Sequence, residues 1–99
     1  MEAFITYDVS ACQNDVKNGM VKLNYTDSWV PNGSTTRYYL PNTSLWKKDT
    51  ELKTALADIQ KVISGLNAAK TYSQETIVLW RCIVVSATPW EGIPGTSVR

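Results

Sequence analysis

The chain of 99 residues contains no histidine and only two cysteines, Cys12 and Cys82. Without histidine, zinc sites that use it and mechanisms that need a histidine base are excluded. Two cysteines are also too few for a secreted disulfide scaffold. Cys12 has no histidine to activate it as a nucleophile, so we interpret it as a structural thiol. Cys82 lies in an apolar run, so we expect it in the core and not bonded to Cys12.

The chain also has almost no net charge and no long apolar run. Ten Lys and Arg residues and nine Asp and Glu residues give a net charge of +1. A protein that follows nucleic-acid phosphates over a long surface is usually far more basic, so extensive electrostatic binding is not expected. No stretch approaches the roughly 20 apolar residues of a membrane span, and the N-terminus lacks the basic and apolar regions of a signal peptide. We therefore expect a cytoplasmic protein with no membrane contact.

Hydrophobic residues make up 43% of the chain, which is typical of one globular domain. β-Branched and aromatic residues predict short strands over residues 3–10, 37–40, 43–47 and 76–86. Pro41-Asn42 fits the central positions of a tight turn between the second and third strands. Residues 26–36 are predicted to form a loop.

A first helix is predicted between the first strand and this loop. Asn14 or Asp15 caps it, and its apolar face consists of Val16, Met20 and Leu23. Asn18-Gly19 is a hairpin signal inside the same segment, and the residues that follow also alternate as a strand would. The helix is favoured because an interior glycine costs only about 1 kcal/mol relative to alanine.

The second helix is the clearest element of the sequence. Asp49 or Thr50 caps it, and Gly65 marks its predicted end. Its apolar stripe consists of Leu52, Ala55, Leu56, Ile59, Val62, Ile63 and Leu66.

The order strand, helix, strand, strand, helix, strand predicts an α+β fold over residues 1–86. Two split βαβ units close into a ferredoxin-like sandwich, with an antiparallel four-stranded sheet of order 4-1-3-2 and both helices on one face. Residues 87–99 are expected to form a C-terminal tail or an extra edge strand, because they contain two prolines and two glycines.

The last strand does not alternate between apolar and polar residues. Val78, Trp80, Cys82 and Val84 form one row, and Ile77, Leu79, Ile83 and Val85 form the other, with Arg81 as the single charge. A sheet with one solvated face would show polar residues at every second position. We therefore predict a homodimer that packs through the sheet or through the C-terminal strand.

Asp8, at the end of the first strand, is the candidate for chemistry. Its carboxylate is a candidate ligand for Mg²⁺, and metal-bound water could then attack a phosphodiester. An aspartate that ends a strand through an Asx turn is the alternative, and residue type alone favours that alternative.

Aromatic and cationic residues are mixed around the predicted hairpin. They are Trp29, Arg37, Tyr38, Tyr39, Trp46, Lys47 and Lys48. Proteins that bind single-stranded nucleic acids combine such residues, which makes Arg37, Trp46, Lys47 and Lys48 candidates for a nucleic-acid contact. Packing of a small sandwich is the alternative, and we consider it the stronger one.

Three motifs follow one another along the chain. They are the strand closed by Tyr7-Asp8-Val9-Ser10, the helix from Asn14 and the final strand that runs on to Trp90-Glu91-Gly92. Together with the hairpin from Tyr39-Leu40 to Trp46, this order resembles the second family of CRISPR-associated proteins, the small spacer-acquisition subunit. It is also similar to the VapD-type toxins and the GhoS antitoxin of the same fold. The likeness spans residues 3–92.

The resemblance implies a homodimer with the first-strand aspartate of each subunit near the two-fold axis. Asp8 then carries over as the catalytic residue and metal ligand, with Ser10 as its neighbour, and RNA or DNA is the substrate. The expected function is a Mg²⁺-dependent endoribonuclease of the CRISPR-associated or toxin–antitoxin type. The alternative is a non-catalytic dimeric module that binds a protein partner or has an architectural role, since a fold does not by itself carry an activity.

Overall fold

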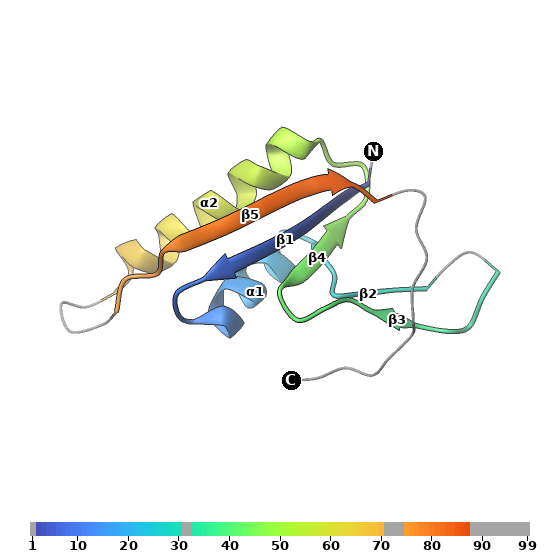
Figure 1. Ribbon diagram of the computed structural model, residues 1–99, viewed down its shortest axis with the longest axis horizontal. Helices are drawn as coiled ribbons and strands as arrows, with labels where there is room; N and C mark the ends of the chain where they lie inside the picture. The colour runs from blue at the N-terminus through green and yellow to red at the C-terminus, as the bar shows by residue number, and fades with distance from the viewer. Residues whose placement is uncertain (1, 31–32, 71–74, 88–99) are drawn as a thin grey trace.

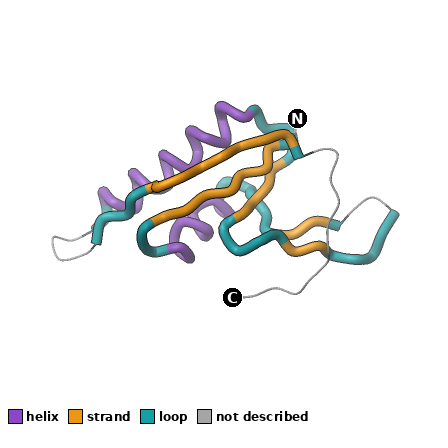
Figure 2. Tube along the Cα trace, in the orientation of Figure 1, coloured by secondary structure: helices purple, strands orange, loops and turns teal. Residues whose placement is uncertain are grey.

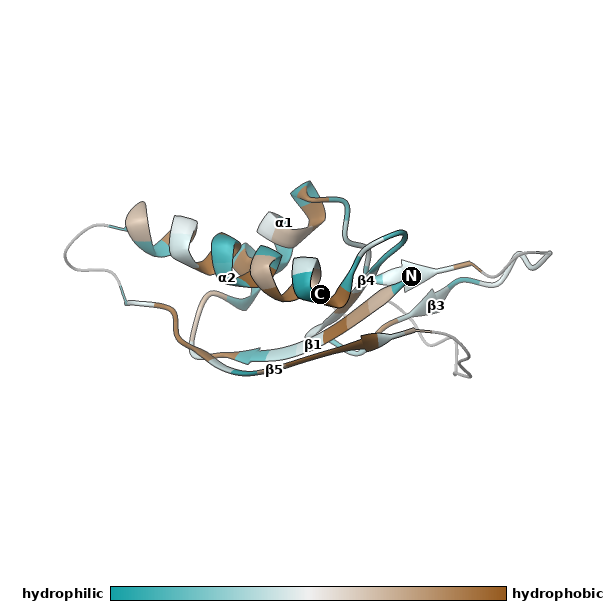
Figure 3. Ribbon diagram, turned by 90° about the horizontal axis from the view of Figure 1, so that it is seen from above, coloured by the Kyte–Doolittle hydropathy of each residue, from teal (hydrophilic) through white to brown (hydrophobic). Residues whose placement is uncertain are grey.

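The computed structural model describes residues 2–30, 33–70 and 75–87 of the chain. Its elements in order are β1 (Ala3–Val9), α1 (Gln13–Lys22), β2 (Ser28–Trp29), β3 (Tyr38–Tyr39), β4 (Ser44–Lys47), α2 (Leu52–Ala68) and β5 (Leu79–Ser86). Both helices lie on one side of the sheet, which we call the inner face, and we call the opposite side the outer face (Figures 1 and 3). Neither helix is long and apolar enough to cross a membrane, within the residues described.

β1 is the central strand of a three-stranded sheet of order β4-β1-β5. Both neighbours run antiparallel to it, so that Ile5 lies opposite Leu45 on one side and Val84 on the other. Side chains of a strand alternate between the two faces, and one row of β1 faces the helices and is buried. This inner row consists of Ala3, Ile5, Tyr7 and Val9. The predicted first strand, the α+β class and the antiparallel pairing are confirmed.

The predicted four-stranded order 4-1-3-2 is wrong, because β3 does not pair with β4. It pairs instead with β2, and the two form a separate two-stranded sheet that projects from the first (Figure 2). Among the described residues, the edge of β4 away from β1 carries only an isolated bridge between Thr26 and Trp46. After this bridge Trp29 stacks on the ring of Trp46, with centroids 4.4 Å apart. The hairpin thus packs Trp29 on β4 and does not extend the edge of β4.

The segment that links β3 to β4 contains the predicted turn, one residue further along the chain than expected. The Ser44 N–H donates to the carbonyl of Pro41 at 2.9 Å, so Pro41 opens the turn and does not occupy its second position. Trp29, expected within a loop, belongs to β2.

The α1 helix runs without interruption through Asn18-Gly19, which confirms the helix over the hairpin. Val16 and Met20 are fully buried on its inner side. The predicted caps at Asn14 and Asp15 are wrong, because both lie inside the helix. The N-cap is Cys12, in a left-handed conformation with φ of 56°.

The α2 helix is longer than predicted at its C-terminal end, since Gly65 lies inside it and the helix ends at Ala68. Its buried residues are Ala55, Ile59 and Ile63, spaced one helical turn apart. Leu56 was expected in this stripe but is 40% exposed, so the core-facing side is narrower than the sequence pattern suggested.

β5 begins at Leu79 and not at residue 76, because the chain before it is held by α2. The side chain of Asn67 accepts the N–H of Ile77 at 2.8 Å and donates to its carbonyl at 2.9 Å. This pair of hydrogen bonds fixes Ile77, which is buried, beside the end of the helix. Except for Ala87, the predicted tail of residues 87–99 lies outside the described residues.

Gly19 permits close packing of α1 on α2. A Cβ atom added at this position would lie 2.6 Å from Cγ1 of Val62, whose β-branched side chain has little freedom to move aside. At Gly65, by contrast, a Cβ atom would meet nothing within 4 Å.

We expect Gly19→Ala to lower the free energy of unfolding by about 1 kcal/mol, since overpacking outweighs the roughly 1 kcal/mol gain in helix propensity. Gly65→Ala is the matched control and should raise it by about 0.5–1 kcal/mol. Urea denaturation followed by circular dichroism measures both values. A Gly19→Ala protein that is stabilised as much as the control would contradict the close packing. In a Val62→Ala background, the Gly19→Ala change should no longer lower the free energy of unfolding.

Candidate functional site

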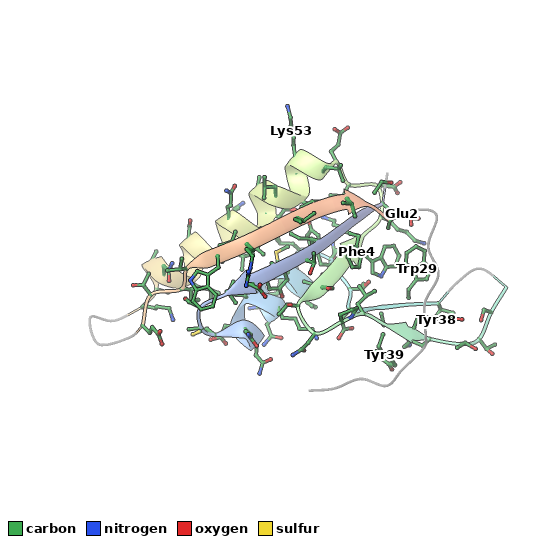
Figure 4. The ribbon with its side chains drawn as sticks, in the orientation of Figure 1. Glu2, Phe4, Trp29, Tyr38, Tyr39 and Lys53 are labelled. Carbon is green, nitrogen blue, oxygen red and sulfur yellow. The ribbon has the colours of Figure 1, made fainter. Side chains whose placement is uncertain are left out.

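The outer face of the sheet carries no helix among the described residues, and its side chains form three rows across the strands. Phe4, Thr6 and Asp8 point outward from β1, between the outward residues of β4 and β5. The rows are Trp46–Phe4–Val85, Ser44–Thr6–Ile83 and Asp8–Arg81. Figure 4 shows Phe4 and Trp29 on this face, near the hairpin. The outer face is therefore mostly apolar, with one charged pair at its end.

A β-bulge at Trp80 determines which side chains of β5 reach this face. Asp8 lies opposite Arg81 and the next residue, Val9, lies opposite Leu79, so Trp80 is the extra residue. The shift places Leu79 against the core and leaves Trp80 63% exposed. Strict alternation would have put Trp80 in the row of Cys82 and Val84, beneath the helices. Bulges commonly re-aim a side chain in this way.

Trp80, Ile83 and Val85 together form a patch that we call the β5 apolar patch. Ile83 is 63% exposed and Val85 is 46% exposed, in the same strand as Trp80. Single exposed apolar residues are common, but three on one strand are a feature of interaction surfaces. The missing alternation of this strand in the sequence is thus explained by an inner row packed on the core and an outer row left uncovered.

Asp8, the predicted catalytic residue and metal ligand, lies on the outer face and is paired with Arg81. The Arg81 Nε donates to Asp8 Oδ2 at 2.9 Å, and the side chains are 47% (Asp8) and 78% (Arg81) exposed. An exposed pair of this kind contributes only about 0–1 kcal/mol to stability. Sequence reasoning missed Arg81 as the partner, although opposite charges near the facing ends of two antiparallel strands were a signal for it.

Asp8, the predicted magnesium ligand, does not belong to a cluster of three metal-binding side chains in the part of the chain that the structure describes. Magnesium in proteins prefers oxygen ligands, and here the carboxylate already accepts a hydrogen bond from a guanidinium group. In residues 2–30, 33–70 and 75–87, no three His, Cys, Asp or Glu residues lie together. Ser10, the predicted neighbour, is engaged with the backbone of Val78, whose N–H donates to the Ser10 hydroxyl at 2.8 Å.

The four candidates for nucleic-acid contact do not share one surface, although Arg37 and Trp46 both bond to Ser28. The Trp46 ring is only 7% exposed, because Trp29 covers it and its indole N–H donates to the carbonyl of Ser28 at 2.8 Å. Lys47 lies on the inner side, with its ammonium group 5.3 Å from the centre of the Tyr25 ring. Arg37 is exposed and donates to the Ser28 hydroxyl at 2.7 Å, and Lys48 is exposed in the turn after β4. The burial of Trp46 therefore agrees with the alternative interpretation, in which the aromatic residues of this region serve packing.

Both cysteines are free, which confirms that they do not form a disulfide. Cys12 lies at the N-terminus of α1 in an open depression lined by residues 10–15, and the Lys70 ammonium donates to its sulfur at 3.5 Å. Cys82 is half-buried against the core, and burial raises the pKa of its thiol. The reactive thiolate form of Cys82 is therefore less favoured than that of a freely exposed cysteine.

Comparison with models of known protein families, with curated proteins and with solved structures finds no match to this chain. The resemblance to the CRISPR-associated family accordingly stays an expectation drawn from the order of its motifs.

Tyr7 lies under the outer face, on the inner row of β1 and opposite Cys82. Burial raises the pKa of its hydroxyl to about 12 from an ordinary value of 10.0, and Cys82 adds to the rise. The folded protein therefore keeps a proton that the unfolded chain releases between these two pH values. Stability from this effect is complete below pH 10 and is lost as the pH rises toward 12.

We expect the free energy of unfolding of the native protein to fall more steeply than that of Tyr7→Phe above about pH 10. The extra slope should reach at most about 1.4 kcal/mol per pH unit, the value for one proton. Guanidinium denaturation at a series of pH values measures both slopes. Equal slopes of the free energy of unfolding above pH 10 in the two proteins would contradict the role of Tyr7. Below pH 9 the two slopes should be equal, which serves as the control.

Proposed function

We propose that this protein is a non-catalytic protein-binding module that works as a homodimer. The observation that carries the proposal is the β5 apolar patch, which leaves Trp80, Ile83 and Val85 uncovered on an otherwise well-packed sheet. Burial of each such side chain contributes roughly 1.5–3 kcal/mol, so covering the patch is a strong driving force for association.

The residue types in and beside the patch support this proposal. Tryptophan and arginine are enriched among the residues that dominate binding energy in protein interfaces, and Trp80 and Arg81 are adjacent in the bulge. The Asp8–Arg81 pair lies at the rim, where a charged pair favours correct partners more than it adds affinity. The chain thus offers an apolar centre with a polar border, the usual composition of an interface.

We expect the native protein to be a dimer at micromolar concentration and Ile83→Lys to be a monomer, because a buried unpaired ammonium group opposes association. Val21→Lys is the matched control: Val21 is 47% exposed on α1, away from the outer face, and its replacement should leave the dimer intact. Light scattering after size-exclusion chromatography measures the mass of each protein. A native protein that is monomeric at this concentration would refute the proposal.

A second candidate function is a Mg²⁺-dependent endoribonuclease centred on Asp8. The observation that favours it is the half-exposed Asp8 carboxylate on the same face as the apolar patch, bound to Arg81 through an exposed contact that solvent or a ligand can replace. In a dimer, Asp8 of the second copy would supply a further carboxylate, in keeping with the one or two carboxylates that magnesium takes in proteins.

We expect cleavage of labelled single-stranded RNA to be absent if the protein is only a binding module, both with Mg²⁺ and with EDTA. The nuclease candidate instead requires metal-dependent cleavage that Asp8→Asn reduces at least a hundredfold. Arg81→Ala is the matched variant, since it removes the same ion pair but keeps the carboxylate. Duplex DNA should be tested in parallel, and equal cleavage by native protein and Asp8→Asn would identify a contaminant.

A further inference from the structure

The hydrogen-bonding groups of β5 divide into one set that points to β1 and one that points away from the sheet. The Ala87 N–H donates to the carbonyl of Glu2 at 2.8 Å, so the hydrogen-bonding groups of Ala87 point toward the chain of β1. In an antiparallel pair every second residue bonds to the same neighbour, so Val85, Ile83 and Arg81 also bond toward β1. The N–H and C=O groups of Cys82, Val84 and Ser86 therefore point outward.

Beyond the bulge at Trp80, the outward edge of β5 carries neither of two features that usually prevent strand pairing, a proline or a lysine. β5 is the outermost strand of the sheet in the described chain, and it contains no proline and no lysine over its eight residues (Figure 1). Its single charge, Arg81, is already paired with Asp8 of the same chain. Among the described residues, this edge is thus largely apolar apart from the Asp8–Arg81 pair, and no other strand lies beside it.

The helix layer is also apolar along the same edge. Val62 of α2 lies against Gly19 of α1, and Leu56 lies about 120° further round the helix, on the flank away from α1. Asn67 shares that flank and bonds to Ile77, just before β5. Leu56, which is 40% exposed, therefore sits on the side of α2 that borders the β5 edge.

We propose that a second copy of this chain adds to the β5 edge, so that the two β5 strands pair antiparallel about a two-fold axis at Val84. The inference rests on the proposed homodimer and specifies its geometry. The two three-stranded sheets then become one continuous sheet, and Leu56 on each α2 faces the partner helix. A strand contact alone is narrow, and this second contact in the helix layer widens it toward the size of a stable interface.

The register follows from the hydrogen-bonding groups and the side chains together. A two-fold axis must pair outward-pointing residues with one another, which allows centres at Cys82, Ile83, Val84 or Val85. A centre at Cys82 or Ile83 places the charged Arg81 against a bulky β-branched residue of the partner, and a centre at Val85 pairs fewer residues of β5. The centre at Val84 sets Arg81 opposite only the small Ala87 of the partner subunit. This centre also places Ile83 opposite Val85 of the partner subunit, and Cys82 opposite Ser86 of the partner subunit.

This arrangement joins the β5 apolar patches of the two subunits on the outer face. Like-with-like pairs of β-branched residues across strands are favourable, and both Arg81–Asp8 pairs stay at the ends, apart from each other. Ile83 of each subunit then packs beside Val85 of the partner subunit, so dimer formation covers part of both patches, and Trp80 remains exposed for a further protein partner.

Disulfide trapping tests the register. In a Cys12→Ser, Cys82→Ala background, Val84→Cys places two thiols opposite each other across the axis, with Cα atoms about 5.5 Å apart. Ile83→Cys is the matched control, because its two thiols lie on diagonal positions at about 7–8 Å, beyond the usual reach of a disulfide. We expect Val84→Cys to form a covalent dimer at least tenfold faster than Ile83→Cys under mild oxidation, measured on non-reducing gels.

A second variant covers the case in which Val84→Cys does not fold. Ser86→Cys, at an exposed position and with Cys82 retained in a Cys12→Ser protein, should bond to Cys82 of the partner subunit. Faster trapping through Ile83→Cys, or through native Cys82 with itself, would overturn the register. A protein that is dimeric by light scattering but is trapped by none of these thiols would overturn edge pairing and leave the proposed function standing. A monomeric native protein would overturn both.

Discussion

The burial of β1 under the two helices is the constraint on which the remaining structure depends. Its inner row is held at 3% exposure or less, between Leu45 of β4 and the half-buried inner row of β5. Because β1 is bonded on both edges, β4 and β5 are parallel to each other, and α2 must cross from one to the other over the inner face. One apolar strand thus determines the sheet order, the helix layer and the position of the bare outer face.

The outer face follows from the same arrangement. Every residue of β1 that does not face the helices faces outward, so Asp8 reaches the outer face as a consequence of the burial of Tyr7 and Val9. Arg81 is opposite Asp8 because β5 is antiparallel to β1, and the bulge beside it turns Trp80 outward. An ion pair and an apolar patch therefore lie next to each other on a surface that supports association better than it supports chemistry by one subunit.

Helix packing and the aromatic hairpin show how tertiary contacts overrode local signals. Asn18-Gly19 is a strong turn signal, yet it lies inside α1 because only glycine lets this helix approach Val62 so closely. Pro41-Asn42 lies at a turn, as its sequence signal predicted. The strand before this turn, β3, pairs with β2 and not with β4, because the stacking of Trp29 on Trp46 holds β2 over β4. Local propensity does not predict either of these contacts, because each joins residues far apart in the sequence.

The sequence by itself determined the first strand, both helices, the antiparallel α+β class and an apolar final strand, because each of these follows from hydrophobic periodicity over neighbouring residues. It also placed Asp8 near the end of β1, although the strand runs one residue further, to Val9. Only the tertiary structure decided the sheet order, the exposure of Leu56 and Trp80, and the pairing of Asp8 with Arg81. These features depend on residues far apart in the chain and on a one-residue bulge, which shifts the facing of a strand without changing its composition.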